Sequence, residues 1–395
     1  MSEWKEYKLG DVVSISSGFS YKGDLIGKGE SFLLGMGCVS FKEKFLHSGA
    51  RLYAGDCPDR YCAEVGDIVL ATRQQSDNLP ILGMPAIIPD TYANKKLIIG
   101  ANLYKVTNNS DFDNKYIYWL LKSVDYVQYI RSCQSGTSVR MITKANIENY
   151  TFKAPDKVTR NKISNILWNI EYKIDLLNRE NKTLETMAET LFRQWFIEEA
   201  KEEWEEGKLG DILSVKGGTT PSTKESSYWD GDIAWTSPRD VTTLNGIYLF
   251  KTEKTITEAG LKQISSGLLP KGTLLMSSRA PVGVLAFAEI PLTINQGYIA
   301  ILDDKGYAKE FIYLWLKANM DLVHSYSNGS TFMEISKSAF KSLDITIPSQ
   351  KEVFDFVTMI QPYFDKIKLN EEQIRLITKQ RDILLPKLMS NEIAI

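Results

Sequence analysis

The sequence predicts an α+β fold that is built twice, as two α+β domains that are each followed by a long helix. First, the segment Trp4–Asp11 returns as Trp204–Asp211, about 200 residues later, which is the length of a domain and not of a solenoid repeat. Second, each repeat contains short apolar runs separated by glycine and proline, as strands do. Third, the apolar spacing changes to a heptad pattern after each repeat.

The repeat continues through the whole unit. Tyr116–Lys122 returns as Phe311–Lys317, and the pair of segments Gly136–Ser138 and Ile142–Lys144 returns as Gly329–Thr331 and Ile335–Lys337. We therefore expect a first domain, a central helix, a second domain and a C-terminal helix, which occupy residues 1–157, 158–200, 201–349 and 350–395. Two similar but unequal units suit the reading of a two-part, asymmetric target.

Alternating apolar residues predict the strands of each domain. The expected strands are Leu9–Ser16 and Gly66–Ala71 in the first domain, with Leu209–Lys216 and Gly272–Ser277 in the second. Asp113–Val124 and Ala308–Met320 are the clearest helices outside the heptad regions. Their aromatic residues Tyr116, Tyr118, Trp119 and Trp315 recur at helical spacing, which favours a place in the core over base stacking.

The heptad regions predict two helices that pair with each other in an antiparallel coiled coil. The expected seam of the first helix is Ile170, Ile174, Leu177, Asn181, Leu184, Ala188, Leu191 and Trp195. The seam of the second is Tyr363, Ile367, Asn370, Ile374, Ile377, Arg381, Leu384 and Leu388. Each seam contains one asparagine, and a buried amide is tolerated best opposite another polar group. The predicted register therefore sets Asn181 against Asn370, Ala188 against Tyr363 and Trp195 against Phe356.

Composition limits the environment and the class of protein. The chain of 395 residues has 43% hydrophobic residues, enough for two cores, and no apolar run reaches the ~18 residues of a membrane span. The expectation is a cytoplasmic protein without a membrane partner. The four cysteines all lie in the first repeat, and reduced thiols suit that compartment. Cys57 and Cys62 offer two metal ligands, but no second pair follows at zinc-site spacing.

The residues for several catalytic chemistries are missing from the sequence. His47 and His324 are the only histidines, and neither a phosphate-binding Gly-x-x-x-x-Gly-Lys loop nor a Gly-x-Gly-x-x-Gly fingerprint occurs. The nuclease-like set Asp156, Glu171 and Lys173 falls in the heptad region, where residues two apart diverge by about 200° around a helix. No catalytic or metal-binding residue is therefore assigned. The net charge of −2 does not by itself indicate a nucleic-acid binder.

A set of ordered motifs in the second repeat resembles a known family. The motifs are Gly217–Ser222, Tyr228–Ile233, Trp235–Asp240, Ser277–Gly283, Asn295–Gln296 and Gly329–Thr331, followed by Pro348 and the heptad helix. In this order, and with the duplication, the whole chain resembles the specificity subunit of type I restriction-modification systems. It departs from the family where a Glu-Gln pair often begins each helix, because Arg160-Asn161 and Lys351-Glu352 stand there instead.

The resemblance implies a sequence-specific DNA-binding subunit with two target-recognition domains and no catalytic activity of its own. It implies double-stranded DNA, two methyltransferase (modification) subunits and two restriction subunits as partners. This chain would bind no cofactor itself, while S-adenosylmethionine, ATP and Mg would be used by the partner subunits. Two alternatives remain open from the residues alone, namely a tandem binding module for another ligand such as a glycan, and a self-contained nuclease.

Loops that follow strands carry the side chains suited to DNA contact, since arginine pairs with guanine, asparagine or glutamine with adenine, and hydroxyl and lysine groups with phosphate. In the first domain we predict Ser20, Tyr21, Lys22, Arg73, Gln74, Gln75, Thr137, Ser138 and Arg140. In the second we predict Thr219, Thr220, Ser222, Lys224, Arg239, Ser278, Arg279, Thr331 and Lys337. Motifs shared by both repeats, such as Arg279 and Gly329–Thr331, are equally consistent with a role in holding the fold. The bases recognised cannot be read from the sequence.

Overall fold

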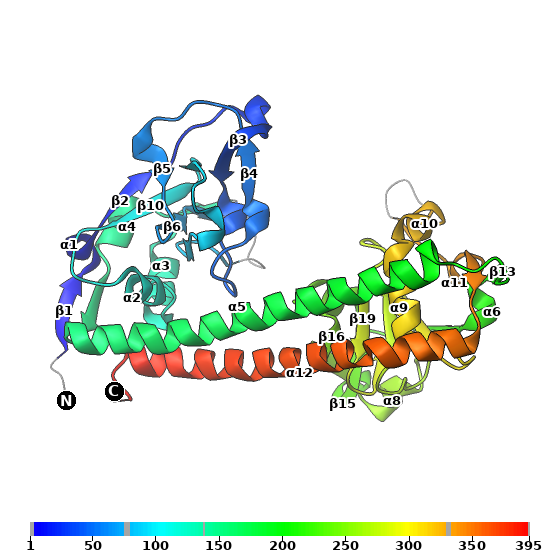
Figure 1. Ribbon diagram of the computed structural model, residues 1–395. Helices are drawn as coiled ribbons and strands as arrows, with labels where there is room; N and C mark the ends of the chain where they lie inside the picture. The colour runs from blue at the N-terminus through cyan, green and yellow to red at the C-terminus, as the bar shows by residue number, and fades with distance from the viewer. Residues whose placement is uncertain (1–3, 75–79, 137–138, 329–332, 394–395) are drawn as a thin grey trace. The chain divides into compact units, whose positions relative to one another are not determined.

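A computed structural model describes residues 4–74, 80–136, 139–328 and 333–393. The chain forms two compact units (Figure 1). Unit 1 consists of Met1–Ile174 with Leu376–Ile395, and unit 2 consists of Asp175–Arg375. Each long helix thus contributes one part of its length to each unit.

Unit 1 is built on two four-stranded sheets. The first has the order β2-β10-β6-β8 and the second the order β4-β3-β9-β5, in which β3 and β9 run parallel. A further pair, β1 and β12, joins the beginning of the unit to the residues before the long helix. The strands are β1 Lys5–Lys8, β2 Val13–Ser17, β3 Ile26–Leu34, β4 Ala50–Tyr53, β5 Cys62–Ala63, β6 Ile68–Ala71, β8 Pro85–Ile87, β9 Leu97–Ile99, β10 Leu103–Asn108 and β12 Thr151–Ala154.

Unit 2 repeats this topology. Its five-stranded sheet has the order β14-β21-β18-β19-β16, its three-stranded sheet the order β17-β15-β20 with β15 and β20 parallel, and β13 pairs with β22. The predicted duplication of an α+β domain is therefore confirmed. The strands are β13 Glu205–Lys208, β14 Ser214–Gly217, β15 Trp229–Thr236, β16 Tyr248–Leu249, β17 Lys254–Ile256, β18 Leu274–Ser277, β19 Leu285–Ala288, β20 Leu292–Ile294, β21 Tyr298–Leu302 and β22 Asp344–Ile347.

The strand that was expected to open each repeat begins later than predicted. Leu9–Val12 forms a single helical turn, α1, and the strand follows it, while Leu209–Ile212 forms the equivalent turn α6. Leu9 and Leu209 are both fully buried. Leu9 and Val12 are three apart, so they face one side of a helical turn but opposite sides of a strand, and the burial of both residues favours the turn.

The expected helix over Asp113–Val124 is two helices, α2 Asn114–Leu120 and α3 Val124–Cys133. Ser123 separates them because its hydroxyl accepts a hydrogen bond from the amide of Tyr126 at 3.3 Å and caps α3. In unit 2 the predicted helix is α9 Lys309–Ala318, followed by α10 Met320–Ser325. The aromatic residues predicted to be core are buried, namely Tyr116, Tyr118, Trp119 and Trp315.

The two long helices are α5 Lys157–Arg193, which continues as a π-helical turn over Gln194–Glu198, and α12 Gln350–Met389. Every residue of the predicted seams is buried or half-buried. In unit 2, Asn370 donates a hydrogen bond to Asn181 Oδ1 at 2.8 Å, and the rings of Trp195 and Phe356 lie 5.7 Å apart. The helices are therefore antiparallel in this unit, in agreement with the predicted register.

Three aromatic residues at the end of α5 exceed what a two-helix seam requires, and they anchor the helix to the core of unit 2. The ring of Phe196 lies 5.0 Å from that of Phe311 on α9 and 4.9 Å from that of Phe356. Phe192 is 1% exposed and lies 5.6 Å from the ring of Phe311. These contacts attach the end of the helical segment to α9 and α12 within unit 2.

Different residues hold the start of each long helix where the Glu-Gln pair of the family is missing. In unit 1, the buried guanidinium of Arg160 donates to Asp111 at 2.8 Å and to the carbonyl of Pro155 at 3.1 Å, and it stacks 3.8 Å from the ring of Phe112. In unit 2, Glu352 accepts from the indole of Trp204 at 2.9 Å and pairs with Lys201. Both junctions are thus held by a charged side chain of the long helix that contacts residues outside the helix.

Glu371 ties α12 to the edge strand of the five-stranded sheet in unit 2. Its two carboxylate oxygens accept hydrogen bonds from the amides of Ile247 at 2.8 Å and Tyr248 at 3.0 Å. A Cβ atom at Gly246 would lie 2.3 Å from the Glu371 carboxyl carbon, so a side chain at this position would displace the carboxylate. Burial raises the pKa of Glu371 to about 7, although the two amide hydrogen bonds oppose the shift.

This pKa predicts how the stability of unit 2 depends on pH. The pKa of Glu371 is raised from 4.5 to about 7 in the folded state, so between these pH values the folded protein binds a proton that the unfolded chain has already lost. The free energy of unfolding therefore falls as the pH rises from about 4.5 to about 7. Glu371→Gln should make the unfolding midpoint of unit 2 less dependent on pH over this range. Glu372→Gln on the same helix is the control and should keep the dependence of the unchanged protein. Equal slopes for all three proteins would contradict the assignment.

Candidate functional site

The loop after β2 contains three predicted residues of unit 1. Ser20 and Lys22 are exposed, whereas Tyr21 is half-buried because its ring packs edge-on against the ring of Tyr53, with centroids 6.4 Å apart. The hydroxyl of Tyr53 also accepts a hydrogen bond from the amide of Lys22 at 3.2 Å. Tyr53 therefore holds the backbone of this loop, while the exposed Lys22 ammonium is available to a ligand.

Three other predicted residues of unit 1, namely Arg73, Gln74 and Arg140, lie where β7 Arg73–Gln74 pairs with β11 Arg140–Met141. Arg73 is exposed, and Arg140 donates to Gln134 at 3.4 Å. Gln74, however, is 7% exposed, and its side-chain oxygen accepts from the amide of Leu82 at 3.2 Å. The expectation that Gln74 reads a base does not fit this burial, because alternate residues of a strand face opposite sides. Its amide group supports the neighbouring loop instead.

Four predicted residues lie outside the part of the chain that the structure describes. They are Gln75, Thr137, Ser138 and Thr331. Their assignment as DNA contacts stays a prediction.

The loop after β14 contains four predicted residues of unit 2. Thr219 is tied into the fold, because its hydroxyl donates to the carbonyl of Gln263 at 2.6 Å and accepts from the amide of Ser265 at 3.1 Å. The hydroxyl of Thr220 contacts Gln296 at 2.7 Å. Ser222 and Lys224 are exposed. In this loop, then, Thr219 shapes the backbone, and Thr220, Ser222 and Lys224 face solvent.

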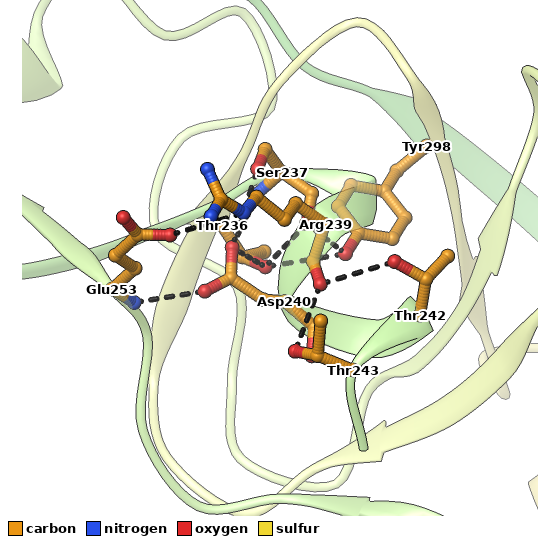
Figure 2. A network of polar contacts seen from close by, with 8 residues as sticks. All are labelled: Thr236, Ser237, Arg239, Asp240, Thr242, Thr243, Glu253 and Tyr298. Atoms are coloured by element: carbon orange, nitrogen blue, oxygen red, sulfur yellow. Dashed lines mark hydrogen bonds and ion pairs between the residues drawn. The ribbon is translucent and has the colours of Figure 1, made fainter. Parts of the chain in front are cut away.

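Arg239 lies on α7 Pro238–Thr242, the turn of helix that follows β15, and a polar network holds the backbone of this turn (Figure 2). Asp240 accepts hydrogen bonds from the amides of Ser237 at 2.9 Å and Glu253 at 2.8 Å. The hydroxyl of Tyr298 donates to the carbonyl of Ser237 at 2.7 Å. These bonds connect the turn to two other segments of unit 2 and leave little freedom for the backbone at Arg239.

The Arg239 side chain itself is presented to solvent. It is 66% exposed, and its nearest charged partner is Glu253, whose carboxylate lies 3.8 Å from Nε and is 60% exposed. An exposed pair at this separation contributes at most about 1 kcal/mol, so a ligand can displace it. Arg239 combines a well-held backbone with an exposed guanidinium, which suits recognition of a base edge or phosphate.

The motif around Arg279 behaves differently. Ser278 is 3% exposed and is bound through its backbone, because its amide donates to Gly297 and its carbonyl accepts from Ile335. Arg279 pairs with Glu334 at 3.1 Å and is 48% exposed. The burial of Ser278 leaves little of its surface open to DNA, and its assignment as a DNA contact stays a prediction. Lys337 is exposed at the first position of α11 Lys337–Lys341, so its side chain is accessible to DNA.

A hollow of about 330 Å³ in unit 1 joins the predicted Tyr21 to three polar residues that the sequence did not single out. Tyr21, Ser48, Arg51 and Asn102 lie at its wall, with glycines between them. We call it the glycine hollow. The sequence signal was the run Gly35-Met-Gly37 directly after an apolar strand, which marks a place where the backbone is left uncovered.

The residues of the alternative nuclease site are used for other purposes. Glu171 is buried on α5 and pairs with Arg381 of α12, and Asp156 accepts a hydrogen bond from the amide of Thr159 at 3.0 Å at the start of α5. Within the described ranges no group of three or more His, Cys, Asp or Glu side chains is placed to hold a metal ion. Among the helices that are described, none has the length and apolar character needed to cross a membrane.

Comparison with known proteins gives one family for both repeats. The family model "Type I restriction modification DNA specificity domain" matches residues 1–186 and again residues 201–379. The chain is 37% identical over 193 residues to the type I restriction enzyme MjaIX specificity subunit of Methanocaldococcus jannaschii, a match that covers 48% of this chain and 45% of that protein. It is 23% identical to the HindI specificity subunit of Haemophilus influenzae over the whole length of both chains.

A solved structure shares the fold. The S subunit of a type I restriction-modification system from M. genitalium aligns with a TM-score of 0.59 and 16% sequence identity, over 98% of this chain and 96% of that one. The two family matches together account for most of the sequence, and each contains one copy of the repeated strand arrangement. The chain therefore belongs to the type I restriction-modification DNA specificity family.

Proposed function

We propose that this chain is the DNA specificity subunit of a type I restriction-modification complex and reads a bipartite, asymmetric site, one half with each repeat. The observation that carries the proposal is the double match of one DNA specificity domain, once to residues 1–186 and once to residues 201–379. The strands shared by the two matches follow the same order, although one sheet in each copy has a strand that the other copy lacks, and the exposed side chains differ between the two copies. A shared scaffold with different loops is what two different half-sites require.

The proposed partners are double-stranded DNA, two modification subunits that methylate adenine, and two restriction subunits in the full complex. On this proposal the chain is not a catalyst, and S-adenosylmethionine, ATP and Mg are used by the partner subunits. The nuclease alternative is weakened by the use of Glu171 in an ion pair within the helices. The glycan alternative has no support in the family match. Because its target is chromosomal DNA, we propose that the protein acts in the cytoplasm.

Reconstitution tests the proposal directly. The chain should be expressed with its modification subunit and incubated with DNA and S-adenosylmethionine, and the methylated adenines should then be mapped. The expected result is methylation at one two-part sequence that depends on the presence of this chain. Methylation that is independent of the chain, or cleavage by the isolated chain with Mg²⁺, would contradict the proposal.

Arg239→Ala tests the second repeat separately. A bidentate arginine-guanine pair contributes about 1–3 kcal/mol of discrimination, so its loss should relax recognition about ten- to hundredfold at one position of one half-site. The other half-site should be unchanged. Glu253→Gln is the matched control, because it removes the ion-pair partner and keeps the guanidinium, and it should preserve the recognised sequence. Binding competition between duplexes that differ at single positions measures both.

A further inference from the structure

The glycine hollow of unit 1 gathers polar side chains that have no protein partner. Arg51 on β4 contributes its guanidinium, Asn102 its amide, and Tyr21 and Ser48 their hydroxyl groups. Among the residues that the structure describes, none makes a hydrogen bond or an ion pair with any of these four side chains. Arg51 and Ser48 are exposed, and Tyr21 and Asn102 are half-buried, so all four polar groups are accessible to a ligand that enters the hollow.

One glycine of the hollow is not required by the fold. Gly100 has to be glycine, because a Cβ atom there would lie 2.7 Å from the carbonyl oxygen of Leu34. At Gly35 the nearest atom to a Cβ would be 3.5 Å away, and the backbone is extended with φ −111° and ψ 177°, which any residue adopts. Packing and backbone geometry would both accept a side chain at position 35. Its absence keeps the hollow open and lets a ligand approach the backbone.

The hollow occupies the position in unit 1 that Arg239 occupies in unit 2. The carbonyl of Leu34, at the end of β3, accepts a hydrogen bond from the amide of Gly100 at 2.9 Å, and the carbonyl of Thr236, at the end of β15, accepts from the amide of Asn295 at 3.0 Å. Leu34 and Thr236 are therefore equivalent, and three residues further on Gly37 stands in the place of Arg239. No arginine follows β3, but Arg51 reaches the same place from the neighbouring strand.

The two arginines also differ in their surroundings. Arg239 is opposed by the carboxylate of Glu253 at 3.8 Å, whereas Arg51 has no carboxylate partner among the described residues. The planar guanidinium carries paired donors that match the O6 and N7 acceptors of guanine in the major groove. The glycines that line the hollow beside Arg51 have no side chains, and this leaves room for the edge of a base.

We infer that the glycine hollow receives the major-groove edge of a guanine in the half-site read by unit 1, and that Arg51 determines this specificity. The inference rests on the proposed function and adds a residue and a base to it. Arg51 in unit 1 and Arg239 in unit 2 then perform the same task from different strands. The two repeats thus recognise DNA at equivalent positions, but the arginine lies on β4 in unit 1 and after β15 in unit 2.

The experiment uses the full chain in complex with its modification subunits. The probes are duplexes that carry the site mapped by methylation, together with a set in which each base pair of both half-sites is changed in turn. Binding is compared for the unchanged protein and for Arg51→Ala, Arg51→Lys and Gly35→Val. Arg131→Ala removes an exposed arginine of α3, outside the hollow, and serves as the charge-matched control.

Arg51→Ala is expected to lose about ten- to hundredfold discrimination at one G·C pair of one half-site, which differs from the half-site altered by Arg239→Ala. Arg51→Lys should lose the same discrimination while it retains most of the affinity for unrelated DNA, because the charge is kept and the paired donors are lost. Gly35→Val should reproduce the loss with Arg51 still present. Arg131→Ala should leave the preference unchanged.

Two results would overturn the inference and leave the proposed function intact. In one, Arg51→Ala weakens binding to every duplex equally, as loss of a phosphate contact would. In the other, the half-site of unit 1 contains no G·C pair at which discrimination depends on Arg51. A complex with unchanged protein that does not distinguish the duplexes at all would instead refute the proposed function, and the inference with it.

Discussion

Exchange of residues 12–150 for the matching segment of another family member is expected to change one half of the methylated sequence and to leave the other half as it was. The reason is that these residues contain the sheets and exposed loops of unit 1, whereas the residues predicted to contact DNA in unit 2 lie beyond Leu209. The helices α5 and α12 stay native in the chimera, and so does the Asn181–Asn370 hydrogen bond. The methylated sequence of the chimera, mapped across a genome, measures the result.

The reciprocal exchange of residues 213–343 provides the control and should alter only the half that the first chimera preserved. A chimera that changes both halves would show that recognition is not modular. Loss of all methylation by a chimera that still assembles with the modification subunits would likewise count against independent reading by the two units.

Arg381→Met is expected to destabilise unit 1 by about 3–5 kcal/mol, because it leaves a buried carboxylate without its partner. Glu171, on α5, is 4% exposed and forms its ion pair with Arg381 of α12. Burial lowers the pKa of the nearby Lys122 to about 8, which indicates how poorly solvated this region is. Hydrogen exchange of the α12 amides beyond residue 376 should report the loss as weaker protection.

Two further variants separate the cost of a broken pair from that of a lost arginine. Glu171→Met combined with Arg381→Met replaces the whole pair by apolar side chains and should recover most of the stability. Asp382 is the second partner of Arg381, and the Asp382 side chain is 60% exposed. Asp382→Asn should therefore lower the free energy of unfolding by no more than about 1 kcal/mol. Equal destabilisation by the single and double methionine variants would show that the ion pair is not responsible.

The helical pairing could be predicted from the sequence because the information is local and periodic. Each seam contains one asparagine, and only one antiparallel alignment places these two asparagines opposite each other. In the structure, Asn370 donates a hydrogen bond to Asn181, as that alignment predicts. The first strand of each repeat was predicted less well. Leu9 and Val12 are three apart, and only the tertiary burial of both residues decides for a helical turn over a strand.

The candidate site was harder to predict from the sequence, because the type of a residue does not show whether it is buried or which loops lie beside it. Gln74 and Ser278 are polar residues in loop-like motifs, yet both are buried and support neighbouring backbone. Arg51 lies in an unremarkable strand, and it becomes a candidate only because Gly35, Gly100 and Asn102 meet beside it in space. Arg239 was found from its motif, but the network that holds its backbone required the structure.

Genome-wide mapping of methylated adenines, in a strain that carries this gene and in one from which it is deleted, tests the central claim most directly. The account predicts one asymmetric motif of two specific parts separated by a non-specific spacer, present in the first strain and lost in the second. Persistence of every methylated motif after deletion, or a motif that consists of a single uninterrupted part, would contradict it.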